Sequence, residues 1–112
     1  MVWIGVDLDG TLAHDEERHL AADEIGAPVP VMVARVKAWR AAGIEVRVVT
    51  ARAHWGPRVR EAIEAWCLLY VGEVFPVTAE KDEEMLELWD DRAVTVVRNT
   101  GLTLEEAADV RT

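Results

Sequence analysis

The chain contains a single cysteine, Cys67, so it cannot form a disulfide bond within itself. This scarcity is typical of proteins that work in a reducing compartment, and we expect a cytoplasmic location. Cys67 lies in the apolar run at residues 65–69, where a small buried side chain is more common than a reactive thiol. We therefore expect Cys67 to serve packing and not thiol chemistry.

Long apolar segments are also missing. No stretch approaches the roughly 18 apolar residues that a membrane span requires. The chain begins without a basic residue, and the apolar run that starts it ends at Asp7, so we expect neither a signal peptide nor a membrane anchor. No membrane partner is expected.

Positive charge is in short supply. The 21 Asp and Glu residues outnumber the 12 Lys and Arg residues, which gives a formal net charge of −9. An acidic surface repels nucleic-acid backbones on average, so the net charge does not favour nucleic acid as a partner. It does not forbid a small basic site that accepts one.

The composition is that of a folded domain. The 112 residues provide room for one domain, residues 1–112, and 51% of them are hydrophobic. The sequence has no internal repeat and no low-complexity tract. Its oligomeric state is left open.

Hydrophobic patterning and the placement of Pro and Gly predict alternating strands and helices. Strands are expected at residues 2–8, 44–50, 74–77, 85–89 and 93–97, with helix as the alternative for 85–89. Helices are expected at 31–42, from Pro57 to Gly72, and after Thr103, which is spaced from Glu106 as in a capping box. Residues 13–30 are expected to form a loop or small flap.

This alternation predicts an α/β fold with three layers, in which helices flank a Rossmann-like, mostly parallel sheet. Ligands bind such sheets beyond the carboxyl ends of the strands. Three expected strands end in polar residues: Asp7 with Asp9, Thr50, and Asp90 with Asp91. The sequence therefore points to a site at this edge of the sheet.

The first polar group is Asp7-Leu8-Asp9-Gly10-Thr11. Two carboxylates two residues apart can face one site once the strand breaks, and Gly10 permits the sharp turn that breaks it. One carboxylate can attack phosphorus while the other transfers a proton. The alternative is an ordinary Asp-rich turn.

The adjacent carboxylates of Asp90 and Asp91 repel each other unless a cation offsets them. With Asp7 nearby they would make a site of hard oxygen donors suited to Mg²⁺. Arg92 could instead neutralise them in a purely structural network.

Thr50 and Lys81 are weaker candidates when each is taken alone. A hydroxyl at a strand end can donate a hydrogen bond to a phosphoryl oxygen, but Thr is also common at the start of loops. A lone Lys is usually a solvated charge. In a phosphoryl site Lys81 would neutralise both the nucleophile and the transferred group.

These elements, in this order, resemble the haloacid dehalogenase (HAD) superfamily of phosphohydrolases. That family has an N-terminal DxDxT motif, matched by residues 7–11, and a Thr or Ser after the second strand, matched by Thr50 in Val49-Thr50-Ala51-Arg52. Its Lys and its late acidic pair are matched by Lys81 and by Asp90-Asp91. The match spans residues 2–97.

The resemblance implies that Asp7 is the nucleophile and forms an aspartyl-phosphate. Asp9 would protonate the leaving group and then activate water, which favours hydrolysis of phosphate monoesters. Thr50 and Lys81 would hold the phosphoryl oxygens. Further phosphate or substrate contacts are expected from Gly10, Thr11 and Arg52.

The resemblance also implies a Mg²⁺ cofactor. Its ligands would be Asp7, the main-chain carbonyl of Asp9, and the late acidic pair. Within that pair, Asp91 is favoured as the residue that binds the ion directly, and Asp90 as a residue that supports the site without binding the ion. The opposite assignment of the two residues stays open.

Larger members of the family insert a cap domain after the first motif or after the second strand, and this chain has room for neither. It therefore resembles a minimal, capless member whose substrate is a phosphorylated small molecule or macromolecule. Nucleotides and polynucleotide ends form one candidate substrate class. A non-catalytic phospho-binding module of the same fold is the alternative, and a phospho-accepting receiver domain fits less well because its acceptor Asp follows the acidic pair.

Overall fold

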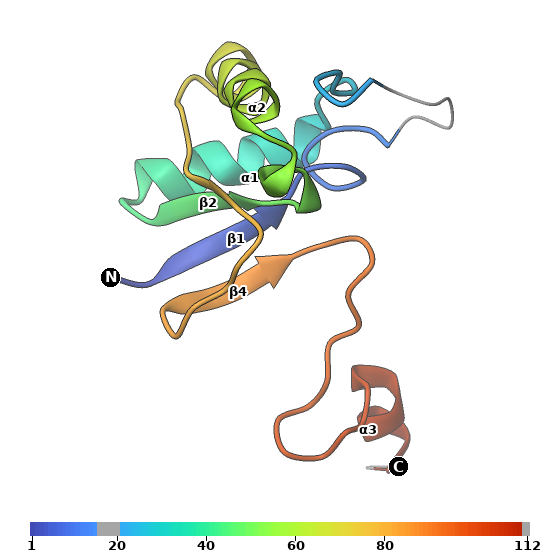
Figure 1. Cartoon of the computed structure of the whole chain (residues 1–112). Coiled ribbons are helices and arrows are strands. Elements are labelled where there is room, and N and C mark those ends of the chain that lie inside the picture. Colours follow the sequence, from blue (N-terminus) through green and yellow to red (C-terminus); the bar gives the residue numbers. More distant parts are fainter. Residues whose placement is uncertain (16–20, 111–112) are drawn as a thin grey trace.

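The computed structural model describes residues 1–15 and 21–110, and it contains one four-stranded sheet. The strand order is β3-β2-β1-β4, and every pair of neighbours is parallel. The strands are β1 (Trp3–Asp7), β2 (Glu45–Val49), β3 (Val77–Thr78) and β4 (Met85–Trp89). The predicted Rossmann-like α/β class is confirmed, and 85–89 is a strand and not a helix (Figure 1).

Two long helices connect the strands, as predicted. They are α1 (Pro30–Ala41) and α2 (Pro57–Tyr70), and each begins with the proline whose missing N–H costs nothing in a first turn. A short 3₁₀-helix, η1 (Ala51–His54), links β2 to α2 and was not expected from the sequence.

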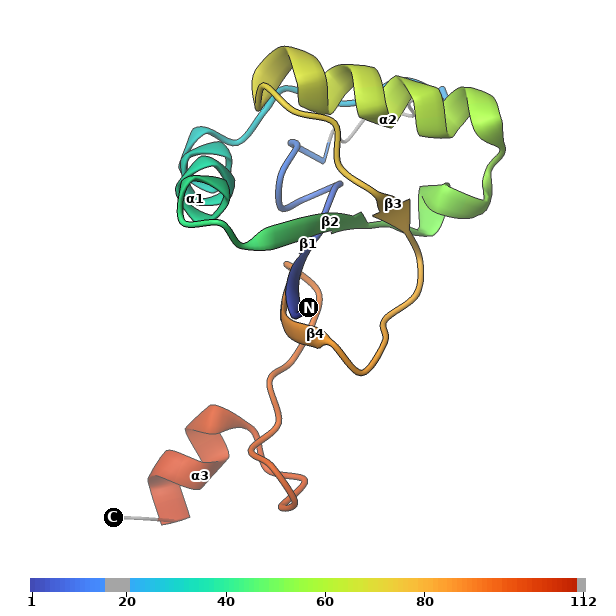
Figure 2. The ribbon, with the colours of Figure 1, turned by 90° about the vertical axis from the view of Figure 1, so that its left-hand side faces the viewer.

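The main core lies between the sheet and these two helices, which pack on the same side of it (Figure 2). Alternate residues of β1 and β2, such as Ile4, Val6 and Val48, point into this core because side chains of a strand alternate between faces. They meet Val36 of α1 and Ile63 of α2, both fully buried.

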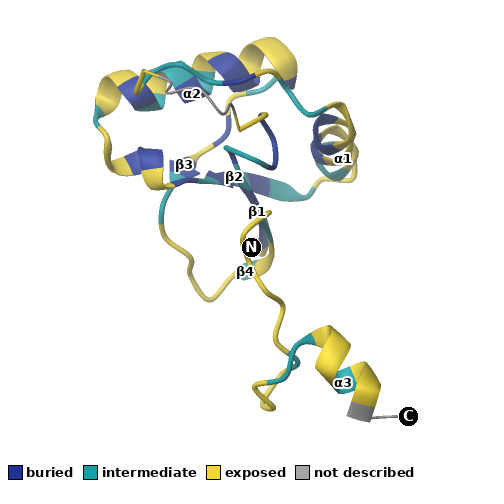
Figure 3. Ribbon diagram, turned by 90° about the vertical axis from the view of Figure 1, so that its right-hand side faces the viewer, coloured by how far each residue is buried: buried dark blue, intermediate teal, exposed yellow. Residues whose placement is uncertain are grey.

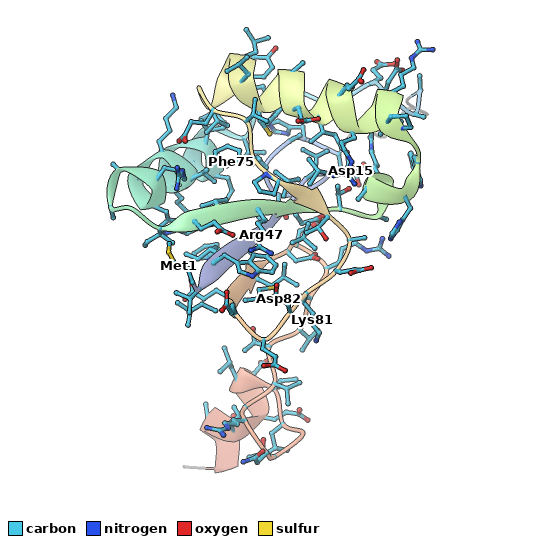
Figure 4. The ribbon with its side chains drawn as sticks, turned by 60° about the vertical axis from the view of Figure 1, so that its left-hand side comes forward. Met1, Asp15, Arg47, Phe75, Lys81 and Asp82 are labelled. Atoms are coloured by element: carbon cyan, nitrogen blue, oxygen red, sulfur yellow. The ribbon has the colours of Figure 1, made fainter. Side chains whose placement is uncertain are left out.

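The loop between β3 and β4 lies over Trp3 and Arg47 on the opposite face of the sheet. The Arg47 guanidinium lies 4.3 Å from the centre of the Trp3 ring. Asp82 of the loop accepts hydrogen bonds from the Trp3 indole (2.8 Å) and from Arg47 (3.3 Å), on the side of the sheet away from α2 (Figure 4). A polar loop therefore covers part of this face, while Leu86 of β4 stays 65% exposed.

The predicted strand at 74–77 is shifted towards the C-terminus. Val74 is 52% exposed, and pairing with β2 begins only at Val77. Pro76 has no N–H to donate to a ladder, and only its carbonyl is used, as the acceptor for the Val48 N–H.

The predicted strand at 93–97 is wrong. This β-branched run has no neighbouring strand, and its one bridge joins Val96 to Thr103 in a local hairpin. The turn of that hairpin contains Asn99 in the left-handed region, with φ at 65°. Strand propensity alone does not make a strand when no sheet edge lies within reach.

The predicted C-terminal helix is present as α3 (Leu104–Val110). Its capping box is formed as expected, since the Thr103 hydroxyl accepts from the Glu106 N–H and the Glu106 carboxylate accepts from the Thr103 N–H. The segment that leads to α3 runs away from the sheet, and most of its residues are exposed (Figure 3).

Among the residues that the structure describes, no helix combines the length and apolar character needed to cross a membrane.

Candidate active site

Three carboxylates meet at the carboxyl end of the sheet. Asp7 is the last residue of β1, and Asp90 and Asp91 directly follow β4, its parallel neighbour. One oxygen from each of the three lies within 4.8 Å of the others. The parallel pairing of β1 and β4 produces this cluster, because it brings the carboxyl ends of both strands to the same edge.

The surroundings of Asp7 disfavour the ionised form of its carboxyl group. Burial, together with the nearby carboxylates of Asp90 and Asp91, raises the pKa of Asp7 to about 7. The Leu8 N–H, which hydrogen-bonds the carboxylate, acts in the opposite direction but is outweighed. A cation between the three carboxylates would favour their ionised forms, and a set of three hard oxygen donors fits Mg²⁺.

Gly10 and Thr11 position Asp91. The Thr11 hydroxyl donates to Asp91 Oδ1 (3.2 Å) and accepts from the Asp91 N–H (3.0 Å). Gly10 has φ at 88°, and a Cβ placed on it would lie 2.5 Å from Asp91 Oδ2. Any larger residue at position 10 would displace the carboxylate, so the Gly-Thr pair serves the acidic cluster in this structure.

A cavity of about 530 Å³ opens beside the cluster. Asp7 and Asp90 line it on one side, and Thr50 lines it at the end of β2. Thr50 is buried, and its hydroxyl oxygen accepts from the Arg52 N–H at 3.2 Å, which fixes that side chain. The structure thus brings together three of the predicted site residues around one space.

Gly10, Thr11 and Asp91 line a second cavity, of about 400 Å³, together with α1 residues and Trp89. Trp89 packs against Trp39 of α1, with ring centres 5.1 Å apart, and the Arg35 guanidinium lies 5.2 Å from the centre of the Trp89 ring. These contacts fix the end of β4 from which the acidic pair projects.

Lys81 does not join the residues that line these cavities. It is exposed in the loop between β3 and β4, next to Asp82 (Figure 4), and it lines neither of the two cavities. Its role as the phosphate-binding cation therefore stays a prediction.

Asp9 and Arg52 are joined to each other. Arg52 Nε donates to Asp9 Oδ2 (3.0 Å) and Nη2 donates to Asp9 Oδ1 (2.9 Å). Asp9 contributes no oxygen to the carboxylate cluster, and its predicted main-chain contact with Mg²⁺ stays a prediction, as does substrate binding by Arg52.

Two cavity residues were not among the main sequence candidates. His54, at the end of η1, and Arg92, directly after the acidic pair, both line the larger cavity. In the sequence, only their positions point to the site: His54 comes four residues after Thr50, and Arg92 comes directly after Asp91. From the sequence, Arg92 is considered only as a residue that could neutralise the acidic pair, and its backbone N–H donates to Asp90 Oδ1 at 2.8 Å.

Cys67 is fully buried in α2, as expected. Burial, with a smaller contribution from Glu64, raises the pKa of its thiol to about 12. Cys67 is therefore a packing residue at neutral pH and not a nucleophile.

No protein-family model matches the chain, and no curated protein matches it in sequence. Among solved structures it is similar to one described as the "conserved protein coded by locus from Bacteroides thetaiotaomicron". The identity is 22% and the TM-score is 0.58, over 97% of this chain and 91% of that one. At this identity the likeness shows the fold alone, and it agrees with the α/β architecture.

Proposed function

We propose that this protein is a Mg²⁺-dependent phosphatase that hydrolyses a phosphate monoester through an aspartyl-phosphate on Asp7. The proposal includes the relationship to the HAD phosphohydrolases that its motifs resemble. The observation that carries it is the meeting of Asp7, Asp90 and Asp91, with oxygens within 4.8 Å, beside a cavity that ends at Thr50.

The roles proposed for Asp7 and Asp9 are those that the resemblance implies, and the place of Asp7 in the cavity lining supports the first of them. An oxygen of Asp7 attacks the phosphorus, and the bond from phosphorus to the ester oxygen breaks. Asp9 gives its proton to the departing oxygen, and it later takes a proton from the water that attacks the phosphoryl group on Asp7. That attack breaks the bond to Asp7 and releases inorganic phosphate.

Thr50 and the cations near the cavity would bind the phosphoryl oxygens. The Thr50 hydroxyl already accepts one hydrogen bond, and it retains its own proton to donate into the cavity. Arg92 lines the same cavity and is a candidate for the positive charge that Lys81 does not bring there.

Bound Mg²⁺ would neutralise the carboxylates and the charge that develops on the phosphoryl group. Asp7, Asp90 and Asp91 would hold it, with Thr11 and Gly10 keeping Asp91 in place. Without a cation, the pKa of about 7 leaves part of Asp7 protonated at neutral pH, and a protonated carboxyl group is a poor nucleophile.

The substrate class that the site suits is a phosphate monoester with a sizeable leaving group, and nucleotides and polynucleotide ends belong to this class. The cavity of about 530 Å³ exceeds what a phosphate alone requires. Trp55, directly after η1 and next to the cavity residue His54, is 56% exposed, so its ring is free to stack on part of a substrate that extends beyond the cavity.

Turnover of an aryl phosphate with Mg²⁺ and with excess chelator tests the proposal. We expect metal-dependent turnover that Asp7→Asn abolishes, while Glu61→Gln, an exposed charge-matched control on α2, leaves it unchanged. Asp9→Asn should slow hydrolysis by about 10²–10⁴-fold and let a phosphorylated enzyme accumulate on Asp7. Binding of Mg²⁺ and phosphate without any turnover would instead identify a non-catalytic phospho-binding module.

A further inference from the structure

Trp55 differs from the other four tryptophans, all of which lie in the described part of the chain. Trp3 and Trp66 are buried, and Trp39 and Trp89 pack against each other. Trp55 is 56% exposed, so more than half of this large side chain faces solvent at the end of η1. A single exposed apolar residue is common, so its meaning depends on what holds the ring and what lies beside it.

Arg52 holds the ring from one side. The Arg52 guanidinium lies 5.6 Å from the centre of the Trp55 ring, and the Trp55 N–H donates to the Arg52 carbonyl at 3.0 Å. Arg52 itself is 7% exposed and is fixed by its two bonds to Asp9. Its Nη1 also donates to the carbonyls of Ala22 (3.0 Å) and Glu24 (2.7 Å). The ring is therefore supported before any ligand arrives, which lowers the entropy cost of stacking on it.

The larger cavity has an acidic end and an apolar end. The strand order β3-β2-β1-β4 places Asp7, at the end of β1, and Asp90, after β4, at one side of the lining. The other side, at the ends of β2 and β3 and the start of η1, is aliphatic and consists of Val49, Ala51 and Ala79. His54, the residue before Trp55, also lines the cavity.

This polarity gives a bound substrate a direction. The phosphoryl group and Mg²⁺ would lie at the acidic end, beside Asp7. The leaving group would then lie along the apolar end, which leads to η1. A leaving group that extends beyond the cavity there would pass His54 and meet the exposed face of Trp55.

We propose that Trp55 determines the choice of substrate by stacking on the base of a nucleoside monophosphate. This inference rests on the proposed function and narrows its substrate class from phosphate monoesters to mononucleotides. Every nucleobase presents a flat π-face, and stacking on an aromatic side chain is a major part of its binding energy. The net charge of −9 disfavours a polynucleotide more than a mononucleotide, because a polynucleotide carries one negative charge for each phosphate along its backbone.

Two substrates that differ only in the base test the inference. AMP and ribose 5-phosphate share the phosphate ester and the sugar, and only AMP carries a base. We expect the wild type to have a higher kcat/KM for AMP, and Trp55→Leu should lower this value by about 10-fold, chiefly through KM. The same change should lower kcat/KM for ribose 5-phosphate far less. Trp55→Phe keeps an aromatic ring and should retain most of the preference for AMP.

Tyr70→Leu is the matched control. Tyr70 is also aromatic and is 41% exposed, but it ends α2 and lines neither cavity, so its loss should leave both substrates unaffected. Calorimetry on Asp7→Asn protein in Mg²⁺ gives a readout that does not need turnover. Adding Trp55→Leu to this protein should raise the dissociation constant of AMP by about 10-fold and leave that of ribose 5-phosphate nearly unchanged.

The possible failures can be told apart. Equal losses on AMP and ribose 5-phosphate would mean that Trp55 supports only the local structure around Arg52. A higher kcat/KM for a 5′-phosphorylated oligonucleotide than for AMP would overturn the assignment of a mononucleotide. Wild-type protein without turnover of any phosphate monoester would remove the proposed function itself. Normal turnover by the wild type, with Trp55→Leu matching Tyr70→Leu on AMP, would remove the role of Trp55 alone.

Discussion

The chain up to Val77 and the chain beyond it differ sharply in burial. Every described residue that is buried lies between Trp3 and Val77, and none from Thr78 to Asp109 is buried (Figure 3). The acidic cluster nevertheless takes Asp7 from the first part and the Asp90-Asp91 pair from the second.

This difference shows what holds the site together. Asp7 is set in a strand that the core fixes on one face. The acidic pair depends on the pairing of β4 with β1, on the Thr11 contacts, and on the packing of Trp89 against α1. A cation shared by the cluster would tie the weakly packed part to the strongly packed part.

The largest effect is expected from the core of the first part. Ile63 is fully buried between α2 and the sheet, and Ile63→Ala should lower the free energy of unfolding by about 2–5 kcal/mol. Leu69 lies on the same helix but is 73% exposed, so Leu69→Ala should change the free energy of unfolding by less than about 0.5 kcal/mol. Urea unfolding of both variants measures the contrast, and similar losses would contradict the burial pattern.

The second prediction concerns the cation that would join the two parts. A ligand that binds only the folded state stabilises it by about 2.7 kcal/mol at 100 times its dissociation constant. We expect Mg²⁺ to slow amide hydrogen exchange in β4 more than in β2, because two of the three carboxylates directly follow β4 and this strand lies at the sheet edge. Asp91→Asn should remove most of this protection, and equal slowing of both strands would argue against a site at the junction.

The third prediction is a pH dependence of the metal-free protein. The pKa of Asp7 rises from 3.8 to about 7 on folding, so between those values the folded state holds a proton that the unfolded state has released. The contribution of Asp7 to stability should therefore be greatest below pH 4, fall as the pH rises towards 7, and level off above that. Because Asp7 is only half-buried, solvent screening reduces the size of this fall.

The difference in urea midpoint between wild type and Asp7→Asn, measured in chelator at pH 5, 6, 7 and 8, isolates this contribution. The subtraction removes the contributions of all other groups. Asp82 does not change its contribution over this range: the Trp3 indole, followed by the Glu84 N–H, lowers its pKa, so its contribution changes only at pH values below this series. A difference that stays constant over this range would show that Asp7 does not titrate as its surroundings require.

Sequence patterns predicted the first part of the chain better than the second. Apolar alternation and the Pro and Gly boundaries located β1, β2, α1 and α2 to within a residue or two, because burial there follows the pattern directly. The pattern at 93–97 is equally typical of a strand, but no sheet edge lies beside this segment. Strand propensity contains no information about whether a partner strand is available.

The predictable and unpredictable parts of the site do not divide between the two parts of the chain in this way. The convergence of Asp7 with Asp90 and Asp91 could be predicted, because parallel strands bring their carboxyl ends to one edge. The pairing of Arg52 with Asp9, 43 residues apart, could not, because it depends on where the backbone of residues 21–26 lies. Lys81 was chosen by its order in the chain, which does not fix where the side chain points.

The smallest effect is expected from removing the end of the second part. The Cα radius of gyration is 15.5 Å, whereas a compact chain of this length has one of about 13 Å. The excess fits the arm formed by residues 95–110, which runs away from the sheet (Figures 1 and 2). Val96 and Leu104 on this arm are 54% and 62% exposed, so little apolar burial is lost with it.

A chain that ends at Val94 should therefore unfold within about 0.5 kcal/mol of the full chain and should keep its turnover, since Asp90, Asp91 and Arg92 remain. The seven-residue α3 is shorter than the roughly 12–15 residues at which an isolated helix becomes even marginally stable in water, so it adds little stability from its own backbone. Urea unfolding and aryl phosphate turnover on the two chains, each at low and at high protein concentration, measure both quantities. A stability loss of several kcal/mol that grows with protein concentration would show that the arm packs against a second molecule, and the contrast between the two parts of the chain would then hold only for the monomer.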